Sequence, residues 1–592
     1  MPLIRTIPSF LARRDSLRTL RRMASSATTA SATVESNGHK RRPFGQNFRF
    51  KNKKHKKQEN AVKQGSHDEV LLYDVQALLK RFSMRESSPS GNLEQNGNLE
   101  TASAALPEPD SEIELTVTEL SSTGDGLAYD PKTQHTYVVP FTVPGDRVRA
   151  KVLTHQKQEG YSFTDLIAVK EPSENRDDSL IKCKYFSKCS GCQFQMMPYK
   201  DQLAHKKTIV EKAYRNFSDL DPALVPPVGD TIGSPLQYGY RTKLTPHFDG
   251  PPGCRRDRRQ GIKPTWPAVP PIGFMLKGTR HTIDIEDCPI GTDAVRLGMK
   301  NERSRVAREI DTYTRGATLL LREDTTRIRK LDANGKPSAA VEKARADPNV
   351  IIEDYPDHVH VKSCVTDSNA KSTEFVDDFV FENPAGSFFQ NNNSILPPFT
   401  QYIRDHVLPR DPDPAKPALS YLIDAYSGSG LFTITLSQMF KKSIGIDISP
   451  QSIEFAGRNA MLNKLRKDQA SFMAADAGAL FKNVTFPADE TVVVIDPPRK
   501  GCDENFLSQL MRFAPERVVY VSCNVHTQAR DVGMLVGGME GVNDGKGMYE
   551  IESLRGFDFF PQTGHVEGVA VLKKRSNGKS ETVEKVEDST KT

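Results

Sequence analysis

The sequence predicts an α/β fold for its C-terminal third, built on a mostly parallel β-sheet with helices between the strands. Two β-branched runs, 491–495 and 518–521, each end abruptly in polar and turn-forming residues, as buried parallel strands do. Residues 422–425 end a third predicted strand, which leads into a glycine-rich turn, and residues 443–447 form a fourth. In a Rossmann-like sheet of this kind, ligands bind beyond the carboxyl ends of the strands, so we expect a functional site there.

The length of 592 residues exceeds what one hydrophobic core can organise, so we expect three or four domains. No apolar run approaches the length that spans a bilayer, which argues against a membrane segment. Eight cysteines in so long a chain do not indicate a secreted disulfide framework, and we expect a reducing compartment.

Residues 1–111 are predicted to be a disordered basic arm followed by an acidic linker. Residues 1–66 contain 16 Lys and Arg against three acidic residues, whereas the whole chain has a net charge of +6, so the remainder is acidic overall. Attraction to nucleic acid is therefore expected mainly from this arm and from local basic patches. Helical spacing of apolar residues predicts a short helix over 70–82.

Residues 1–34 are rich in Arg, Ser, Thr and Ala and contain one acidic residue, Asp15, which is the composition of a mitochondrial transit peptide. An ordinary basic tail has the same composition. Met23 offers a second start, so we expect a mitochondrial form, a cytoplasmic-nuclear form, or both. The basic runs at 40–42 and 51–57 fit a nuclear signal, an RNA-attracting arm or a plain solvated tail.

Residues 112–172 are predicted to form a small five-stranded barrel of the OB type. Short strand patterns at 113–117, 137–141 and 148–152 are joined by Gly and Pro turns. The stretch resembles the TRAM domain of RNA-modifying enzymes, which implies contact with RNA. Strand spacing alone leaves a barrel of unrelated use open.

Four cysteines of the central region, 173–395, are candidate metal ligands: Cys183, Cys189, Cys192 and Cys288. Three close thiolates and one distant one can surround a metal centre, because tight loops aim sulfurs inward while the fold closes the fourth side. Spacing alone leaves structural zinc, a [4Fe-4S] cluster and an empty site open.

The rest of the central region is expected to be α+β. An amphipathic helix is predicted over 200–215 and strands over 238–248 and 272–285. Between those strands, the arginine-rich loop 254–259 is either a phosphate contact or a solvated insertion. The hydrophilic stretch 322–349 is predicted to be a long insertion.

Residues 396–575 are predicted to bind a nucleotide-like cofactor, and residues 576–592 to be a disordered tail. The glycine turn at 426–430 lets the backbone approach a ligand, and Asp447 ends the next strand, where a carboxylate accepts hydrogen bonds from ribose hydroxyls. The turn lacks the third glycine of the dinucleotide fingerprint and a basic residue for a pyrophosphate. S-adenosylmethionine therefore fits better than a nicotinamide cofactor.

Five motifs occur in the order typical of the RNA (uracil-5-)-methyltransferases, which the chain resembles from the barrel to about Leu572. They are Ser-Phe-Phe-Gln at 387–390, Asp-x-Tyr-x-Gly-x-Gly at 424–430, Asp-Pro-Pro-Arg-Lys-Gly at 496–501, Ser-Cys-Asn at 522–524 and Phe-Pro-Gln-Thr-Gly-His-Val-Glu at 560–567. The resemblance, closest to the eukaryotic tRNA branch, implies a class I methyltransferase domain that acts on the T-loop uridine of tRNA.

The same resemblance assigns roles to the candidate site residues. It implies that Cys523 is the nucleophile and Glu567 the general base. The S-adenosylmethionine contacts would be Gln390, Tyr426, Asp447 and Asp496. The run from Cys183 to Cys192 looks like the iron–sulfur signature of the family, which favours a [4Fe-4S] cluster on the four cysteines. Val525 departs from the family, which usually has a proline there that would stiffen the turn after the nucleophile.

The chemistry of uracil methylation asks for these groups independently. Carbon 5 is a poor nucleophile until a thiolate adds to carbon 6, and cysteine forms a thiolate more readily than other side chains with a nucleophilic atom. The carbon 5 proton must then leave, and Glu567, in an apolar segment, is expected to have a pKa raised toward the useful range. A stacked base is unreachable, so the target base is expected to flip into the pocket.

Two other functions fit parts of the sequence. A ribosomal RNA uracil-5 methyltransferase would carry the same motifs, and an RNA-binding or tRNA-folding factor with an inactive domain would have lost the thiol or the carboxyl, which are both present. A cytosine-5 enzyme would need a Pro-Cys pair, and no such dipeptide occurs in the chain. Beyond tRNA, no obligate protein partner is implied.

Overall fold

The computed structural model describes residues 64–86, 105–475, 481 and 484–575. The expected targeting segment with Met23, the basic runs of the arm and the C-terminal tail lie outside these residues, as does most of the acidic linker. Within the described part of the chain, no helix is both long and apolar enough to cross a membrane.

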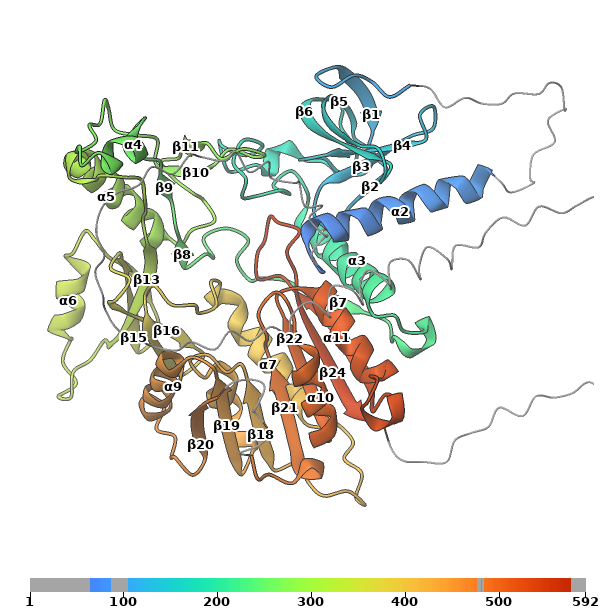
Figure 1. Cartoon of the computed structure of the whole chain (residues 1–592). Coiled ribbons are helices and arrows are strands. Elements are labelled where there is room, and N and C mark those ends of the chain that lie inside the picture. Colours follow the sequence, from blue (N-terminus) through green and yellow to red (C-terminus); the bar gives the residue numbers. More distant parts are fainter. Residues whose placement is uncertain (1–63, 87–104, 476–480, 482–483, 576–592) are drawn as a thin grey trace, which may run out of the picture. The chain divides into compact units, whose positions relative to one another are not determined.

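An eight-stranded sheet organises the C-terminal region, with the strand order β20-β19-β18-β21-β22-β24-β23-β7 (Figure 1). The strands are β7 (Gly229–Ile232), β18 (Tyr421–Ala425), β19 (Lys442–Asp447), β20 (Ala470–Ala474), β21 (Thr491–Ile495), β22 (Arg517–Ser522), β23 (Tyr549–Phe557) and β24 (Glu567–Lys574). From β20 to β22 the strands are parallel, whereas β24 runs antiparallel to both of its neighbours. The strand order reverses at β18 and β21, which is where open α/β sheets bind ligands.

Helices cover both faces of this sheet, and the predicted Rossmann-like fold is confirmed. On one face lie α3 (Tyr199–Phe217), α10 (Glu504–Phe513) and α11 (Val525–Gly537), and on the other lie α7 (Leu396–Val407), α8 (Leu431–Leu436) and α9 (Pro450–Leu462). Along β21, Val493 and Ile495 pack into one core, and Val492 and Val494 pack into the other. After Thr491 the strand is apolar at every position, because both of its faces are buried.

The barrel region contains six strands in the order β1-β5-β6-β4-β3-β2, so the expected count of five was wrong by one. They are β1 (Glu112–Thr116), β2 (Glu119–Leu120), β3 (Gly126–Asp130), β4 (His135–Val139), β5 (Arg147–Gln156) and β6 (Tyr161–Glu171). β2 has only two residues, which are too few to show the alternation of apolar and polar residues that predicts a strand. The helix expected over 70–82 is α2 (His67–Glu86), longer at both ends.

The central region is α+β, as expected, but its strands are short. Its strands are β8 (Lys243–Leu244), β9 (His247–Phe248), β10 (Gly273–Met275), β11 (Thr282–Asp284), β12 (Ala317–Thr318), β13 (Leu321–Arg329), β14 (Ile351–Asp354), β15 (His358–Val365), β16 (Lys371–Val376) and β17 (Phe379–Pro384). Its helices after α3 are α4 (Cys254–Arg259), α5 (Asp293–Glu309) and α6 (Ala339–Arg345). The single strand predicted over 238–248 is two strands of two residues, because Pro246 interrupts the ladder.

The arginine-rich loop predicted at 254–259 is the short helix α4, and none of its residues is buried. The hydrophilic stretch 322–349, predicted to be an insertion, instead contributes a central strand. β13 lies between β15 and β8, so its start is buried. There Arg322 pairs with Glu374, and Glu323 lies 3.5 Å from the Lys362 ammonium. From the sequence alone, such charged residues are assigned to the protein surface, because the partners that allow their burial lie far away along the chain.

Candidate active site

One cavity of about 750 Å³ lies at the carboxyl ends of the strands of the C-terminal sheet. Its lining includes all six residues predicted for catalysis and cofactor binding: Gln390, Tyr426, Asp447, Asp496, Cys523 and Glu567. Tyr426 follows β18, Asp496 follows β21 and Cys523 follows β22, while Glu567 is the first residue of β24. Five sequence motifs that are far apart along the chain therefore converge on a single cavity.

The turn after β18 is shaped to hold a ligand close to the backbone. Tyr426 has a left-handed φ of +64°, which costs energy for a side chain with a Cβ and concentrates at functional sites. Gly428 donates its backbone N–H to Asp447 Oδ2 at 3.0 Å, and Ser449 donates its N–H to Asp447 Oδ1 at 2.8 Å. The Asp447 carboxylate is thus fixed in the cavity wall.

One buried hydroxyl at this turn has no partner. Ser427 lines the cavity, and its buried hydroxyl has no hydrogen-bond partner within the part of the chain that the structure describes. Buried hydroxyls normally are hydrogen-bonded. A fixed carboxylate and an unpaired hydroxyl beside a glycine turn suit a ligand with ribose hydroxyls and an amino group, which fits the predicted S-adenosylmethionine.

Burial dominates the electrostatics of the reactive groups. It raises the pKa of the Glu567 carboxyl to about 8, with a further contribution from Asp496, while Arg499 acts in the opposite direction. Burial likewise raises the pKa of Asp496 to about 7, helped by Asp424. A carboxyl with a pKa near neutrality can both accept and release a proton, as a general base must.

The Cys523 thiol has a pKa of about 12, because burial and the neighbouring carboxyls Glu567 and Asp496 disfavour the thiolate. The sequence led us to expect an easily formed thiolate, and the protein environment alone does not produce one. Protonation of Glu567 or Asp496, or a cation brought in by a ligand, would lower this pKa.

Arg499 is a functional candidate that residue-by-residue reasoning did not single out. It lines the cavity, and its hydrogen bond and positive charge lower the pKa of Cys523. The Arg499 carbonyl accepts from the side-chain amide of Asn524 at 3.1 Å and from the Thr527 hydroxyl at 3.2 Å. The signal was present in the Asp-Pro-Pro-Arg motif, which places an arginine three residues after Asp496.

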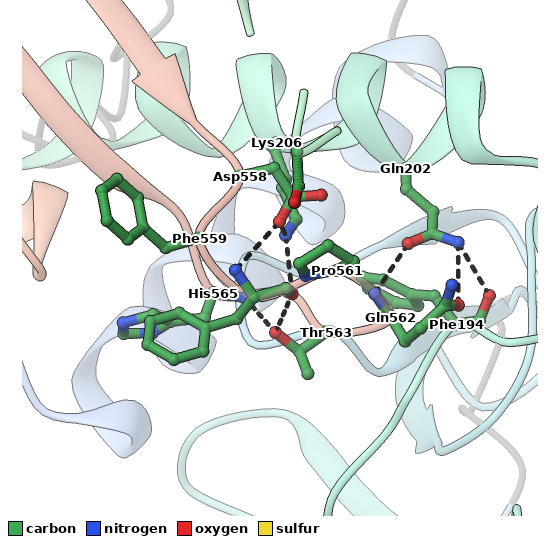
Figure 2. A network of polar contacts seen from close by, with 12 residues as sticks. Phe194, Gln202, Lys206, Asp558, Phe559, Pro561, Gln562, Thr563 and His565 are labelled. Atoms are coloured by element: carbon green, nitrogen blue, oxygen red, sulfur yellow. Dashed lines mark hydrogen bonds and ion pairs between the residues drawn. The ribbon is translucent and has the colours of Figure 1, made fainter. Parts of the chain in front are cut away.

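A buried ion pair holds the loop that leads to Glu567 (Figure 2). Lys206 of α3 and Asp558 are both fully buried and contact each other, and Figure 2 shows their charged ends meeting beside the loop. Lys206 also donates to the Phe560 carbonyl at 3.0 Å, and Asp558 accepts from the Phe560 N–H at 3.1 Å. Breaking a buried pair leaves an uncompensated charge at a cost of about 3–5 kcal/mol, so this anchor is rigid.

Glutamines tie the same loop to α3 and to the segment after the predicted cluster cysteines (Figure 2). Gln202 donates to Gln562 Oε1 at 3.1 Å and accepts from the Gln562 N–H at 3.0 Å. The Gln562 carbonyl accepts from the backbone N–H groups of Gln193 and Phe194. Gln562 has a φ of +71°, so the bonds hold it in a left-handed conformation.

The four predicted cluster cysteines are neighbours in the structure. Burial raises the pKa of Cys192 and of Cys288 to about 12, and the charges of the other cysteines add to it, which requires the four sulfurs to lie close. Cys189 and Cys288 pack against one hydrophobic cluster. Within the described residues, however, no group of three or more His, Cys, Asp or Glu side chains is arranged to hold a metal ion.

Two family models match the chain in the regions described above. Residues 372–575 match the model described as tRNA (Uracil-5-)-methyltransferase, and residues 108–164 match the TRAM domain. The predicted TRAM-like barrel and methyltransferase domain are confirmed as fold assignments.

Fungal relatives and one solved structure extend the comparison. The chain is 41% identical over 515 residues to the tRNA (uracil(54)-C(5))-methyltransferase of Schizosaccharomyces pombe, covering 87% of this chain and 84% of that one. It is 39% identical over 538 residues to the enzyme of the same name in Saccharomyces cerevisiae, covering 85% and 81%.

The crystal structure of Pyrococcus abyssi tRNA (uracil-54, C5)-methyltransferase in complex with S-adenosyl-L-homocysteine has the same fold. It matches with a TM-score of 0.51 at 21% identity and covers 78% of this chain and all of the other. Together with the convergent motifs, the identity to the two fungal enzymes over most of both chains leads to one conclusion. The chain belongs to the tRNA (uracil-5-)-methyltransferase family.

Proposed function

We propose that the protein methylates carbon 5 of the T-loop uridine of tRNA, the position named in its fungal relatives as uracil 54. One observation carries this proposal. The Cys523 thiol, the buried Glu567 carboxyl and Asp447, the candidate ligand for a ribose, all line the same cavity. Identity near 40% to two enzymes with this printed activity supports the choice of tRNA over ribosomal RNA.

The residues of the cavity fit S-adenosylmethionine as the methyl donor. Asp447 and the glycine turn would face its ribose, while Gln390 and Tyr426 would contact the rest of the molecule; all of them line the cavity. When bound, this cofactor supplies an electrophilic methyl group and a positive charge. The cavity wall that faces it carries Asp447 and Asp496, which suits a cationic ligand.

The reaction follows from the positions of the protein groups. The Cys523 thiolate adds to carbon 6 of the uracil, which places negative charge on the ring and makes carbon 5 nucleophilic. Once carbon 5 carries the methyl group, Glu567 accepts the carbon 5 proton. The electron pair of that C–H bond forms the ring double bond and expels Cys523 as a thiolate. Arg499 stabilises the Cys523 thiolate before it adds to carbon 6 and again when it is expelled.

The rate of proton abstraction is expected to rise with pH. Glu567 acts as a base only when it is ionised, and its pKa of about 8 means that most molecules carry the neutral acid at pH 7. The rate at which 5-methyluridine is released in a single turnover should therefore increase between about pH 6 and about pH 9. Single-turnover reactions quenched at set times over this pH range would measure the rate. A rate that falls with rising pH would contradict Glu567 as the base.

The proposed activity is tested with purified full-length protein and tRNA transcripts. We expect transfer of one labelled methyl group to a transcript with uridine at position 54 and none to a matched transcript with cytidine there. A ribosomal RNA fragment methylated faster than the tRNA would overturn the choice of substrate. Absence of transfer to any RNA would overturn the activity itself.

A [4Fe-4S] cluster on Cys183, Cys189, Cys192 and Cys288 is also part of this proposal. Four neighbouring thiols, three of them within ten residues, are the donor set that such a cluster takes. Among the described residues these sulfurs are not arranged as a metal centre, and we assign the cluster no part in the reaction.

The cluster is tested by anaerobic reconstitution with iron and sulfide. We expect about four irons per chain and broad absorption near 400 nm, and expect both to be lost in Cys288→Ser but kept in Cys254→Ser. Zinc retained in place of iron, or no metal under any condition, would contradict the proposal.

A further inference from the structure

The helix α2 and the three residues before it contact three separate parts of the protein. Neither family model reaches this segment, since the matches begin at residues 108 and 372. Leu71, Val75 and Leu78 are fully buried and pack with barrel residues, whereas Val70 packs into the core that the C-terminal sheet shares with α3 and α11. The segment therefore bridges the barrel and the catalytic domain.

Polar contacts fix the orientation of α2 across that bridge. Asp74 is buried, accepts from the backbone N–H of Ser122 in the barrel and lies 3.5 Å from the Lys212 ammonium of α3. Arg81 pairs with Glu119 of the barrel. Since α2 is tied at its middle and near its C-terminal end, its N-terminal end has a defined place.

That N-terminal end lies against the residues that follow the nucleophile. The Gly65 carbonyl accepts from the Asn524 side-chain amide at 3.2 Å, and the Gln64 side-chain carbonyl accepts from Arg530 at 3.0 Å. Asn524 is the residue after Cys523 and caps α11 with its side chain. The same amide group of Asn524 also donates to the carbonyl of Arg499, which lines the cavity. One side-chain amide therefore links Gly65 to the cavity wall.

A second line of contacts runs from α2 to the start of α11 through aromatic rings. Tyr73 packs on Phe217 with ring centroids 4.8 Å apart, and Phe217 packs on His526 with centroids 5.1 Å apart. His526 follows Cys523 by three residues. Val525, the first residue of α11, has no ring to fix its φ, so contacts from outside help to hold this turn.

We propose that residues 64–86 are a positioning element for the reaction. They hold the turn that contains Cys523 and Asn524 in a fixed position relative to Arg499. The inference rests on the proposed function, because it concerns the geometry of the proposed nucleophile. Gly65 is its contact point: it has a φ of +67°, and a Cβ there would lie 2.5 Å from Thr527 Cγ2. Thr527 is hydrogen-bonded to the carbonyls of Arg499 and Asn524, so displacing it moves both.

The test compares Gly65→Ala with Gly541→Ala in the full-length protein. Gly541 has a φ of +76° and no atom within 4 Å of its Cβ position, so both variants carry the same left-handed backbone cost, but only the first meets the Thr527 methyl group. We expect Gly65→Ala to lower the single-turnover methylation rate about tenfold, with the tRNA Kd changed less than about twofold. Gly541→Ala should leave both within about twofold.

A second-site change distinguishes positioning from general damage. Thr527→Ser removes the clashing methyl group and keeps the hydroxyl, so the Gly65→Ala/Thr527→Ser variant should regain at least about threefold of the lost rate. Equal rates in Gly65→Ala and Gly541→Ala, or no recovery in the double variant, would overturn the inference. A tRNA Kd that weakens in step with the rate would also overturn it, because the segment would then be an RNA-binding element.

Amide hydrogen exchange separates failure of this inference from failure of the proposed function. If the unaltered protein methylates no RNA, the proposed function fails, and exchange at residues 524–530 still reports the contact. We expect faster exchange there in Gly65→Ala than in Gly541→Ala. Equal exchange would show that residues 64–86 do not hold this turn.

Discussion

Replacing Cys523 with alanine is expected to lower methylation by at least about a thousandfold and to leave tRNA binding intact. Without the thiolate, carbon 5 has no route to becoming nucleophilic, and Cys523 is the one cysteine among the described residues that line the cavity. The side chain is half-buried at a strand end, so its loss should not unfold the sheet. Methylation kinetics and a filter-binding Kd, measured on the same preparation, check this result.

The control for this prediction is Cys254→Ala, since Cys254 lies on α4 and not in the cavity lining. It should methylate at the unaltered rate. Turnover retained in Cys523→Ala would remove the proposed nucleophile. A tRNA Kd weakened by more than about tenfold would mean that Cys523 serves binding rather than chemistry.

Replacing Glu567 with glutamine is expected to slow turnover by about a hundredfold to ten-thousandfold and to leave protein bound to RNA. Glutamine has nearly the same shape but accepts no proton, so carbon 5 would receive its methyl group and keep its hydrogen. Cys523 then cannot be expelled, and a covalent, methylated complex should accumulate. Denaturing gels with labelled cofactor would detect it.

The matched control is Glu550→Gln, which alters an exposed carboxyl on β23 that pairs with Lys573 of β24. It should form no lasting complex. If Glu567→Gln released free 5-methyluridine at the unaltered rate, another group would be the base. If it formed no complex and no product, Glu567 would act before carbon–sulfur bond formation instead of after methyl transfer.

The catalytic sheet could be predicted from sequence because its signals are local. β21 and β22 are short, and each contains a run of Val, Ile or Tyr that ends in polar residues. A parallel pair of such strands places Asp496 and Cys523 at one edge of the sheet. Glu567 reaches the same cavity by a different route, at the start of an antiparallel strand. Its assignment came from the resemblance, since its own sequence neighbourhood contains no such pattern.

The parts that could not be predicted depend on partners distant in sequence. The sequence around Arg322 indicates an exposed segment, because its ion-pair partner Glu374 lies in another strand. Lys206 belongs to an amphipathic helix, where a lysine is expected on the exposed face, but it is buried and paired with Asp558. The positive φ of Tyr426 and of Gln562 is imposed by surrounding bonds and leaves no mark on residue type. The thiol pKa of about 12 likewise arises from burial and from neighbouring carboxyls.

The most direct test of the central claim uses tRNA that carries 5-fluorouridine in place of the target uridine. Fluorine cannot leave carbon 5 as a proton does, so Cys523 should stay bonded to carbon 6 after methyl transfer. We predict a one-to-one, cofactor-dependent complex that survives denaturation, with the nucleotide on the peptide containing Cys523. Attachment to any of the other cysteines, or active enzyme that forms no complex, would contradict the account.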